Sequence, residues 1–159
     1  MSNYRRSQIQ GSSYFFTVVS YRRQPILCDT AIRNALRRAI DKTRQQHPFT
    51  IDAWVLLPDH LHCIWTLPGG DADYAKCRGI IKRRVNIECR SLYRDDSLLT
   101  DSIRKHREST TWQHRYWAHQ LRDQHDFNRH MDYIHYKPVK HGLCAHPNQW
   151  PYSTLHRLN

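Results

Sequence analysis

Two apolar runs of equal length, residues 50–57 and 60–67, are separated only by Pro58-Asp59. Both runs are rich in β-branched and aromatic side chains, and a two-residue break that contains proline is typical of a tight turn. The pair therefore predicts a β-hairpin. This feature constrains the fold most, because it fixes the pairing of two strands and the face on which each of their side chains lies.

The segments around the hairpin alternate between strand and helix patterns. We predict further strands at residues 14–21 and 116–121, and helices at 30–47, 73–93 and 126–137, the last ending at Pro138. Residues 94–113 are polar and unpatterned, which predicts a loop with at most a short helical piece. The order indicates an α+β fold, a ferredoxin-like (RRM-like) antiparallel sheet with helices on one face plus an added C-terminal helix. We expect a single domain over residues 1–159.

The chain has 159 residues and a net charge of +11 with its histidines neutral, and 39% of its residues are hydrophobic. That apolar fraction supports a core and excludes a disordered polycation. So large a positive charge favours a polyanionic partner. Nucleic acid is preferred over a membrane surface, because no basic amphipathic helix with a bulky apolar face stands out.

The five cysteines are scattered and form no CxxC pair, which favours buried free thiols in a reducing compartment over disulfides or a zinc ribbon. The amino-terminal residues, MSNYRRSQIQGSS, lack the apolar run of a signal peptide. We therefore expect a cytoplasmic protein with no membrane partner, associated with the nucleoid if it binds DNA.

His60 and His62 stand at the start of the second hairpin strand. Side chains two apart on a strand share a face, so the two imidazoles project together, whereas Leu61, Cys63 and Trp65 face the other way. Two adjacent imidazoles are a natural pair of metal ligands. The alternative is a chance pair of exposed histidines in a chain that has twelve.

Tyr133 lies on the predicted C-terminal helix. A phenol must lose its proton to attack a phosphate, and a metal ion held by His60 and His62 would polarise that phosphate and orient the attack. A phosphotyrosine conserves the energy of the ester bond, so a strand could be cut and rejoined without ATP. The alternative role for Tyr133 is packing in the core.

The segment LPDHLHCIWTLP, followed later by YIHYKPVKHG, resembles the REP-associated tyrosine transposases, relatives of the single-tyrosine insertion-sequence transposases in the His-hydrophobic-His nuclease class. The resemblance extends along most of the chain. It includes Tyr4-Arg5-Arg6, Tyr14-Phe15-Phe16-Thr17-Val18, Ala53-Trp54-Val55, Trp112-Gln113, Tyr116-Trp117 and Trp150-Pro151-Tyr152-Ser153-Thr154.

This resemblance implies the ferredoxin-like fold, His60 and His62 as metal ligands, Tyr133 as the nucleophile and Mg²⁺ or Mn²⁺ as the cofactor. It also implies a substrate of single-stranded DNA in which a REP hairpin is flanked by a short tetranucleotide, and a protein that cuts and rejoins DNA there. The insertion-sequence relatives are dimers with shared active sites, whereas the REP-associated group looks able to act as a monomer, so both a monomer and a homodimer stay open.

Lys137 departs from the family pattern, which usually has Asn or Gln four residues after the tyrosine, where it completes the metal site. A protonated lysine has no lone pair to donate and repels a cation. Three outcomes are open: two histidines with water and substrate suffice, His135 or Asp132 substitutes, or the enzyme is weak or inactive. Lys137 could instead contact the scissile phosphate.

Clusters of basic residues predict contacts with DNA phosphates. They are Arg5, Arg6, Arg22 and Arg23 beside the first strand, Lys82, Arg83 and Arg84 on the second helix, and Arg104, Lys105 and Arg107 in the loop. Tyr4, Trp112 and Trp117 could stack on unpaired bases, although for the two tryptophans we expect burial. The resemblance makes Tyr4-Arg5-Arg6 the candidate reader of the tetranucleotide.

Two other functions remain as alternatives. One is a catalytically weak or inactive REP-hairpin-binding protein on the same fold, motivated by Lys137. The other is an RRM-like RNA-binding domain, which is disfavoured because the aromatic RNA-contact motif of that fold is absent.

Overall fold

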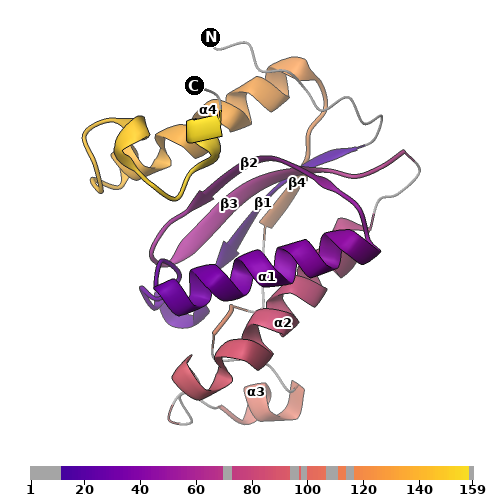
Figure 1. Cartoon of the computed structure of the whole chain (residues 1–159), viewed down its shortest axis with the longest axis vertical. Helices are drawn as coiled ribbons and strands as arrows, with labels where there is room; N and C mark the ends of the chain where they lie inside the picture. The colour runs from indigo at the N-terminus through magenta and orange to yellow at the C-terminus, as the bar shows by residue number, and fades with distance from the viewer. Residues whose placement is uncertain are drawn as a thin grey trace.

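A four-stranded antiparallel sheet forms the middle layer of the computed structural model, which describes residues 12–69, 73–93, 97, 100–106, 111–113 and 117–157 (Figure 1). Its strands are β1 (Ser13–Val19), β2 (Thr50–Leu56), β3 (His60–Thr66) and β4 (Trp117–Gln120), in the order β2-β3-β1-β4. The ferredoxin-like α+β fold is therefore confirmed. The predicted hairpin is β2 and β3, closed by a hydrogen bond from Leu57 N to His60 O of 2.8 Å.

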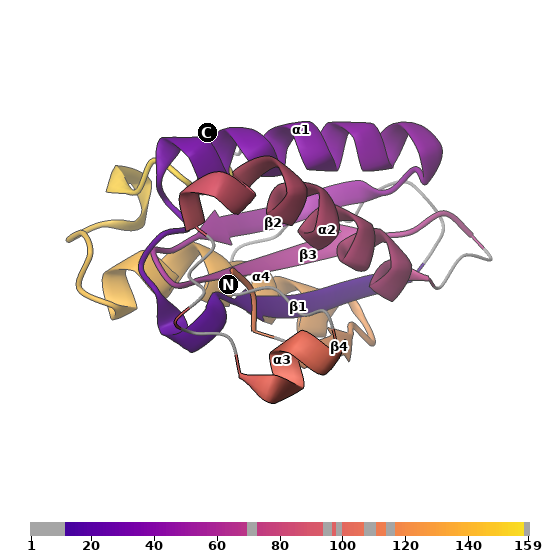
Figure 2. The same cartoon turned by 90° about the horizontal axis from the view of Figure 1, so that it is seen from below.

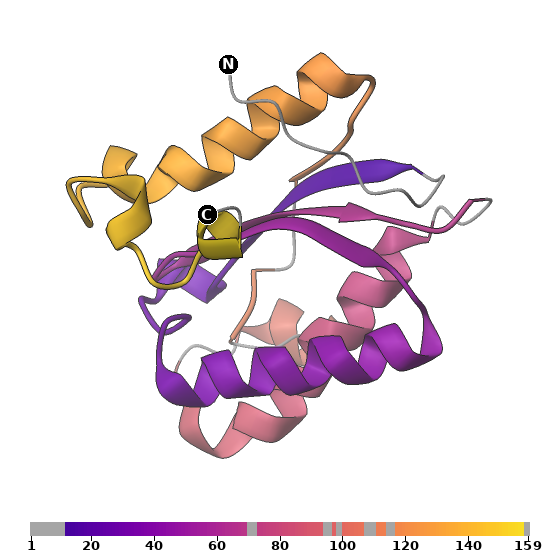
Figure 3. The ribbon, with the colours of Figure 1, turned by 45° about the horizontal axis from the view of Figure 1, so that its top comes forward.

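Helices cover both faces of the sheet. The helices α1 (Thr30–Gln46) and α2 (Tyr74–Tyr93) pack on one face, and α4 (Gln124–Lys140) lies across the other, as Figures 2 and 3 show. Four shorter helices complete the described chain: η1 (Tyr21–Arg23), α3 (Asp101–His106), η3 (Pro147–Gln149) and η4 (Thr154–Arg157).

The two faces carry separate apolar cores. Leu61, Cys63 and Trp65 point into the core under α1 and α2, together with Cys77, Ile81 and Val85 of α2. Ile64 points into the core under α4, among Phe127, Met131 and Ile134. The alternation expected along β3 is therefore confirmed, and it leaves His60 and His62 on the α4 side of the sheet.

The bounds of α4 differ from the prediction at both ends. The helix begins at Gln124 because the Asp123 side chain accepts a hydrogen bond from Asp126 N (2.8 Å), which makes Asp123 the N-cap. It also continues through Pro138 to Lys140. Proline lacks the amide hydrogen that would bond to Ile134 O, yet helical bonding resumes beyond it, with a bond from His141 N to Lys137 O of 3.0 Å.

Candidate active site

The two histidines of β3 are held by different neighbours. His62 is paired across the sheet with Thr17 of β1, and its Nδ1 lies 2.7 Å from Thr17 Oγ1. His60 Nδ1 lies 2.6 Å from Asp59 Oδ1 in the hairpin turn. Their rings are 4.9 Å apart between centroids. Because each Nδ1 has a partner, Nε2 is the atom that each imidazole can offer to a metal ion.

Burial keeps both imidazoles neutral. It lowers the pKa of His62 to about 2, and electrostatic interactions with His60, Lys137 and His141, which disfavour a second positive charge nearby, lower it further. Burial also lowers the pKa of His60, although the Asp59 carboxylate opposes the shift. The buried His62 Nε2 has no hydrogen-bond partner within the described part of the chain. A buried neutral imidazole with an unpartnered ring nitrogen fits a metal ligand better than a structural side chain.

Tyr133 lies beside this pair on α4. Its ring centroid is 5.4 Å from that of His62, and the side chain is 40% exposed, whereas the adjacent Ile134 is fully buried in the core. The phenol is therefore at the surface next to the histidines, where it can reach a substrate. Core packing accounts for Ile134 but not for Tyr133.

Lys137 follows Tyr133 by one helical turn and is only 9% exposed. Its Nζ lies 4.5 Å from the centroid of the Tyr133 ring, and its charge lowers the pKa of both His60 and His62, after burial has done so. The i, i+4 spacing thus brings the lysine to the site as predicted. The two residues named as substitutes for the missing amide are placed differently. His135 Nε2 lies 3.1 Å from Thr154 Oγ1, on the side of α4 next to β2. Asp132 is half-buried and directly precedes Tyr133.

His141 is a site residue that the sequence pattern did not single out. It is the C-cap of α4, and its ring centroid lies 5.1 Å from that of His60. Burial lowers its pKa, and Lys137 lowers it further. The available signal was the stripe Tyr133, Lys137, His141, which repeats every four residues and so continues one helical face beyond Pro138.

A second group of side chains also converges. The ligand atoms of His119, Asp126 and His130 lie within 4.8 Å of one another and could hold a metal ion. Asp126 Oδ2, however, already lies 2.8 Å from His119 Nε2 and accepts from Arg122 N, while His130 Nδ1 lies 2.8 Å from Asp126 O. These bonds tie β4 to the first turn of α4, so the group also has a structural role.

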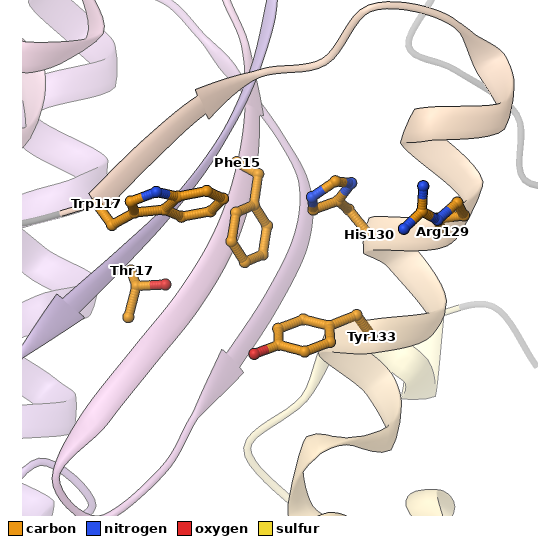
Figure 4. A pocket seen from close by; sticks show the side chains of 6 residues that line it. All are labelled: Phe15, Thr17, Trp117, Arg129, His130 and Tyr133. Atoms are coloured by element: carbon orange, nitrogen blue, oxygen red, sulfur yellow. The ribbon is translucent and has the colours of Figure 1, made fainter.

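A pocket of about 330 Å³ opens between the sheet and α4 next to Tyr133 (Figure 4). It is lined by Phe15, Thr17, Trp117, Arg129, His130 and Tyr133. Figure 4 shows the Tyr133 hydroxyl pointing from α4 toward the sheet. The two tryptophans differ: Trp112 is buried as expected, but Trp117 is 56% exposed, on a short strand that stands at the edge of the described sheet.

The basic clusters lie at different distances from the site. Arg23 reaches it, because its Nη1 lies 3.3 Å from the Oδ2 of Asp59, the residue that holds His60. Lys82, Arg83 and Arg84 lie on α2, across the sheet from α4, and Lys82 Nζ donates to Gln113 O at 3.2 Å. Tyr4, Arg5, Arg6, Arg107 and the side chain of Lys105 lie outside the described residues.

Residues 8–137 match the family described as "Transposase IS200 like". An Escherichia coli (strain K12) REP-associated tyrosine transposase is 40% identical over 99% of this chain and 84% of its own length. A protein of Haemophilus influenzae (strain Rd) is also 40% identical, over 99% of this chain and 87% of its own. A solved structure of a REP-associated tyrosine transposase bound to a REP hairpin superposes with a TM-score of 0.76 at 41% identity, covering 99% of this chain and 84% of that one.

None of the helices in the described ranges is both long and apolar enough to span a lipid bilayer.

Proposed function

Since the chain belongs to the IS200-like transposases, and among them to the single-tyrosine REP-associated enzymes, we propose that it cuts and rejoins single-stranded DNA beside REP hairpins through a 5′-phosphotyrosine at Tyr133. The solved relative that is bound to a REP hairpin supports this choice of substrate. Acting on such DNA would place the protein at the nucleoid, and we propose that the whole chain works as one domain.

The observation that carries this proposal is the position of Tyr133 beside an unused histidine nitrogen. The exposed phenol ring lies 5.4 Å from the ring of His62, whose buried Nε2 lacks a partner among the described groups. His60 and His62 would hold a divalent cation, Mg²⁺ or Mn²⁺, which would neutralise charge on the scissile phosphate when bound. Imidazole ligands favour Mn²⁺ over Mg²⁺.

Cleavage by Tyr133 needs no external energy source, because one phosphate ester is exchanged for another. Its phenol oxygen attacks phosphorus as the proton leaves to solvent, a P–O bond to tyrosine forms, and the P–O3′ bond breaks. The products are a 5′-phosphotyrosine and a free 3′-hydroxyl. Attack of a 3′-hydroxyl on the phosphotyrosine reverses the step and rejoins the strand. One ester is exchanged for another in each direction.

Lys137 would contact the scissile phosphate. The residue is only 9% exposed, its ammonium group lies over the Tyr133 ring, and its charge lowers the pKa of both histidines. A cation at that place stabilises the negative charge that develops on the phosphate oxygens during the attack. This role would let the enzyme work without the amide that other members of the family carry.

We propose two further contacts with DNA. The segment Tyr4-Arg5-Arg6 would read the tetranucleotide beside the hairpin, as the family resemblance implies. Lys82, Arg83 and Arg84 would bind phosphates away from the reaction, because α2 lies on the opposite face of the sheet from α4.

The deciding test is formation of a covalent protein–DNA adduct. Labelled single-stranded REP hairpin DNA is incubated with protein and Mn²⁺ or Mg²⁺ and resolved on a denaturing gel. We expect a shifted band for the wild type and for Tyr136→Phe, a matched control three residues along the same helix, but none for Tyr133→Phe. An undiminished band with Tyr133→Phe would overturn the assignment of the nucleophile.

The alternative function is a REP-hairpin-binding protein with little or no activity. The observation that favours it is the charge of the largely buried Lys137, which lowers the pKa of His62 and would equally repel a cation there. Tight binding of the hairpin with no covalent band under either metal would support this alternative. A band that then appears with Lys137→Asn would identify the lysine as the cause.

A further inference from the structure

We propose that the pocket beside Tyr133 binds one unpaired nucleobase next to the scissile phosphate, stacked against Trp117. The inference rests on the proposed function, since it needs DNA at Tyr133. It adds a base-binding subsite separate from the histidine pair and from the basic clusters.

The size and position of the pocket fit a single base. Its volume of about 330 Å³ is at the lower end for small-ligand sites, so it suits one base and excludes a duplex. Tyr133 forms one wall, and Figure 4 shows its hydroxyl directed inward. A base in the pocket would therefore be within one nucleotide of the attacked phosphorus.

Trp117 offers a stacking surface that is already in place. The indole is 56% exposed, yet its edge packs against Phe15 at 5.5 Å, and it stacks on His119 with an angle of 13° between the rings. His119 is fixed in turn by its 2.8 Å contact with Asp126. A large aromatic side chain held open to solvent is what an unpaired base needs, because stacking tolerates any base.

Polar groups at the pocket link the base to the reaction. The exposed Arg129 lies in the wall contributed by α4 and brings guanidinium donors for a base edge or the adjoining phosphate. Thr17 lines the opposite wall, and its Oγ1 also holds His62 Nδ1. The base would thus lie against the residue that orients a proposed metal ligand.

A fluorescent base analogue tests the contact directly. REP hairpin DNA with 2-aminopurine on either side of the cleavage site is titrated with protein carrying Tyr133→Phe, which prevents cutting and keeps the ring. We expect quenching at one of the two positions. Adding Trp117→Ala should abolish the quenching and weaken binding about tenfold. Trp117→Phe should keep both the quenching and the original affinity, because a phenyl ring can still stack on the base. The control Tyr136→Ala removes an equally exposed aromatic ring from the same protein and should change neither.

Failure of this inference is distinguishable from failure of the proposed function. If wild-type protein forms the covalent adduct equally fast on intact DNA and on DNA lacking either flanking base, the base subsite is wrong and the function stands. If quenching depends on Trp117 but no adduct forms on any DNA, the subsite stands and the tyrosine chemistry is wrong. Quenching that survives Trp117→Ala overturns the stacking role of Trp117.

Discussion

Lys137 stands where members of the resembled family usually carry Asn or Gln, and its burial sharpens the consequence. An ammonium group held near His60 and His62 opposes the binding of a cation by the same charge that lowers their pKa values. The site would therefore bind metal more weakly than one with an amide at this position. The positive charge of Lys137 near the scissile phosphate would compensate for the weaker metal binding, because it too stabilises negative charge there.

Substitution of Lys137 by asparagine tests this trade. We expect Lys137→Asn to raise Mn²⁺ affinity about tenfold, because it removes a like charge and adds a ligand oxygen. Isothermal titration calorimetry of the DNA-free protein measures the change. Lys137→Met is the matched control, since it removes only the charge and should give a smaller gain. If neither variant changes the Mn²⁺ affinity, Lys137 does not influence metal binding and the prediction is wrong.

His62 predicts how stability depends on pH. The folded pKa of about 2 lies below the ordinary value of 6.5, so the unfolded chain binds more protons between these values and stability falls as the pH falls through that window. His62 alone should remove about 2 kcal/mol of unfolding free energy between pH 7 and pH 5 in metal-free protein. Urea unfolding at both pH values measures this, and His62→Gln should show a correspondingly smaller loss. Equal losses in both proteins would contradict the buried neutral imidazole.

For the secondary-structure elements, the local sequence pattern predicted the hairpin and the face on which each side chain of β3 lies. The Pro58-Asp59 break and the period of two along β3 were enough to place Leu61, Cys63 and Trp65 on one face and the histidines on the other. The ferredoxin-like fold was expected from the order of strands and helices and from the resemblance, and the observed sheet and the family match confirm it.

Other features could not be predicted locally. The exposure of Trp117 depends on β4 being an edge strand, which no local pattern reveals. Pro138 indicated a helix end, but the helix continues to Lys140, and this extension is what carries His141 to within 5.1 Å of the His60 ring. Proline usually ends or kinks a helix, but this tendency is not absolute, and the helix here continues past it.

The N-cap of α4 is testable at this scale. Asp123 accepts from Asp126 N at the start of the helix that bears the nucleophile, so Asp123→Ala should lower the unfolding free energy by about 1 kcal/mol. Thermal unfolding followed by circular dichroism measures the loss. Asp41→Ala, at an exposed position within α1, should cost clearly less. A melting temperature unchanged in Asp123→Ala would mean that the cap does not hold the helix.

For the whole molecule, the net charge of +11 predicts that hairpin binding weakens steeply with salt. If Lys82, Arg83 and Arg84 contact phosphates, replacing all three with alanine should reduce the slope of log affinity against log salt by about 2 to 3. Fluorescence anisotropy across a salt series gives that slope. Covalent adduct formation at saturating protein should be unchanged, because α2 lies across the sheet from Tyr133. An unaltered slope would mean that Lys82, Arg83 and Arg84 do not contact the phosphates of the hairpin.

The alternation along β3 also limits how this protein can diverge. A substitution at Leu61 or Cys63 alters packing on one face and leaves the histidines where they are. Deleting a single residue of β3 just after the histidines would instead shift the rest of the strand by one position, so that the imidazoles and the apolar side chains that follow could no longer all keep their present faces. Lineages that keep the reaction can therefore exchange one apolar residue of this strand for another more readily than they can change its length by one residue.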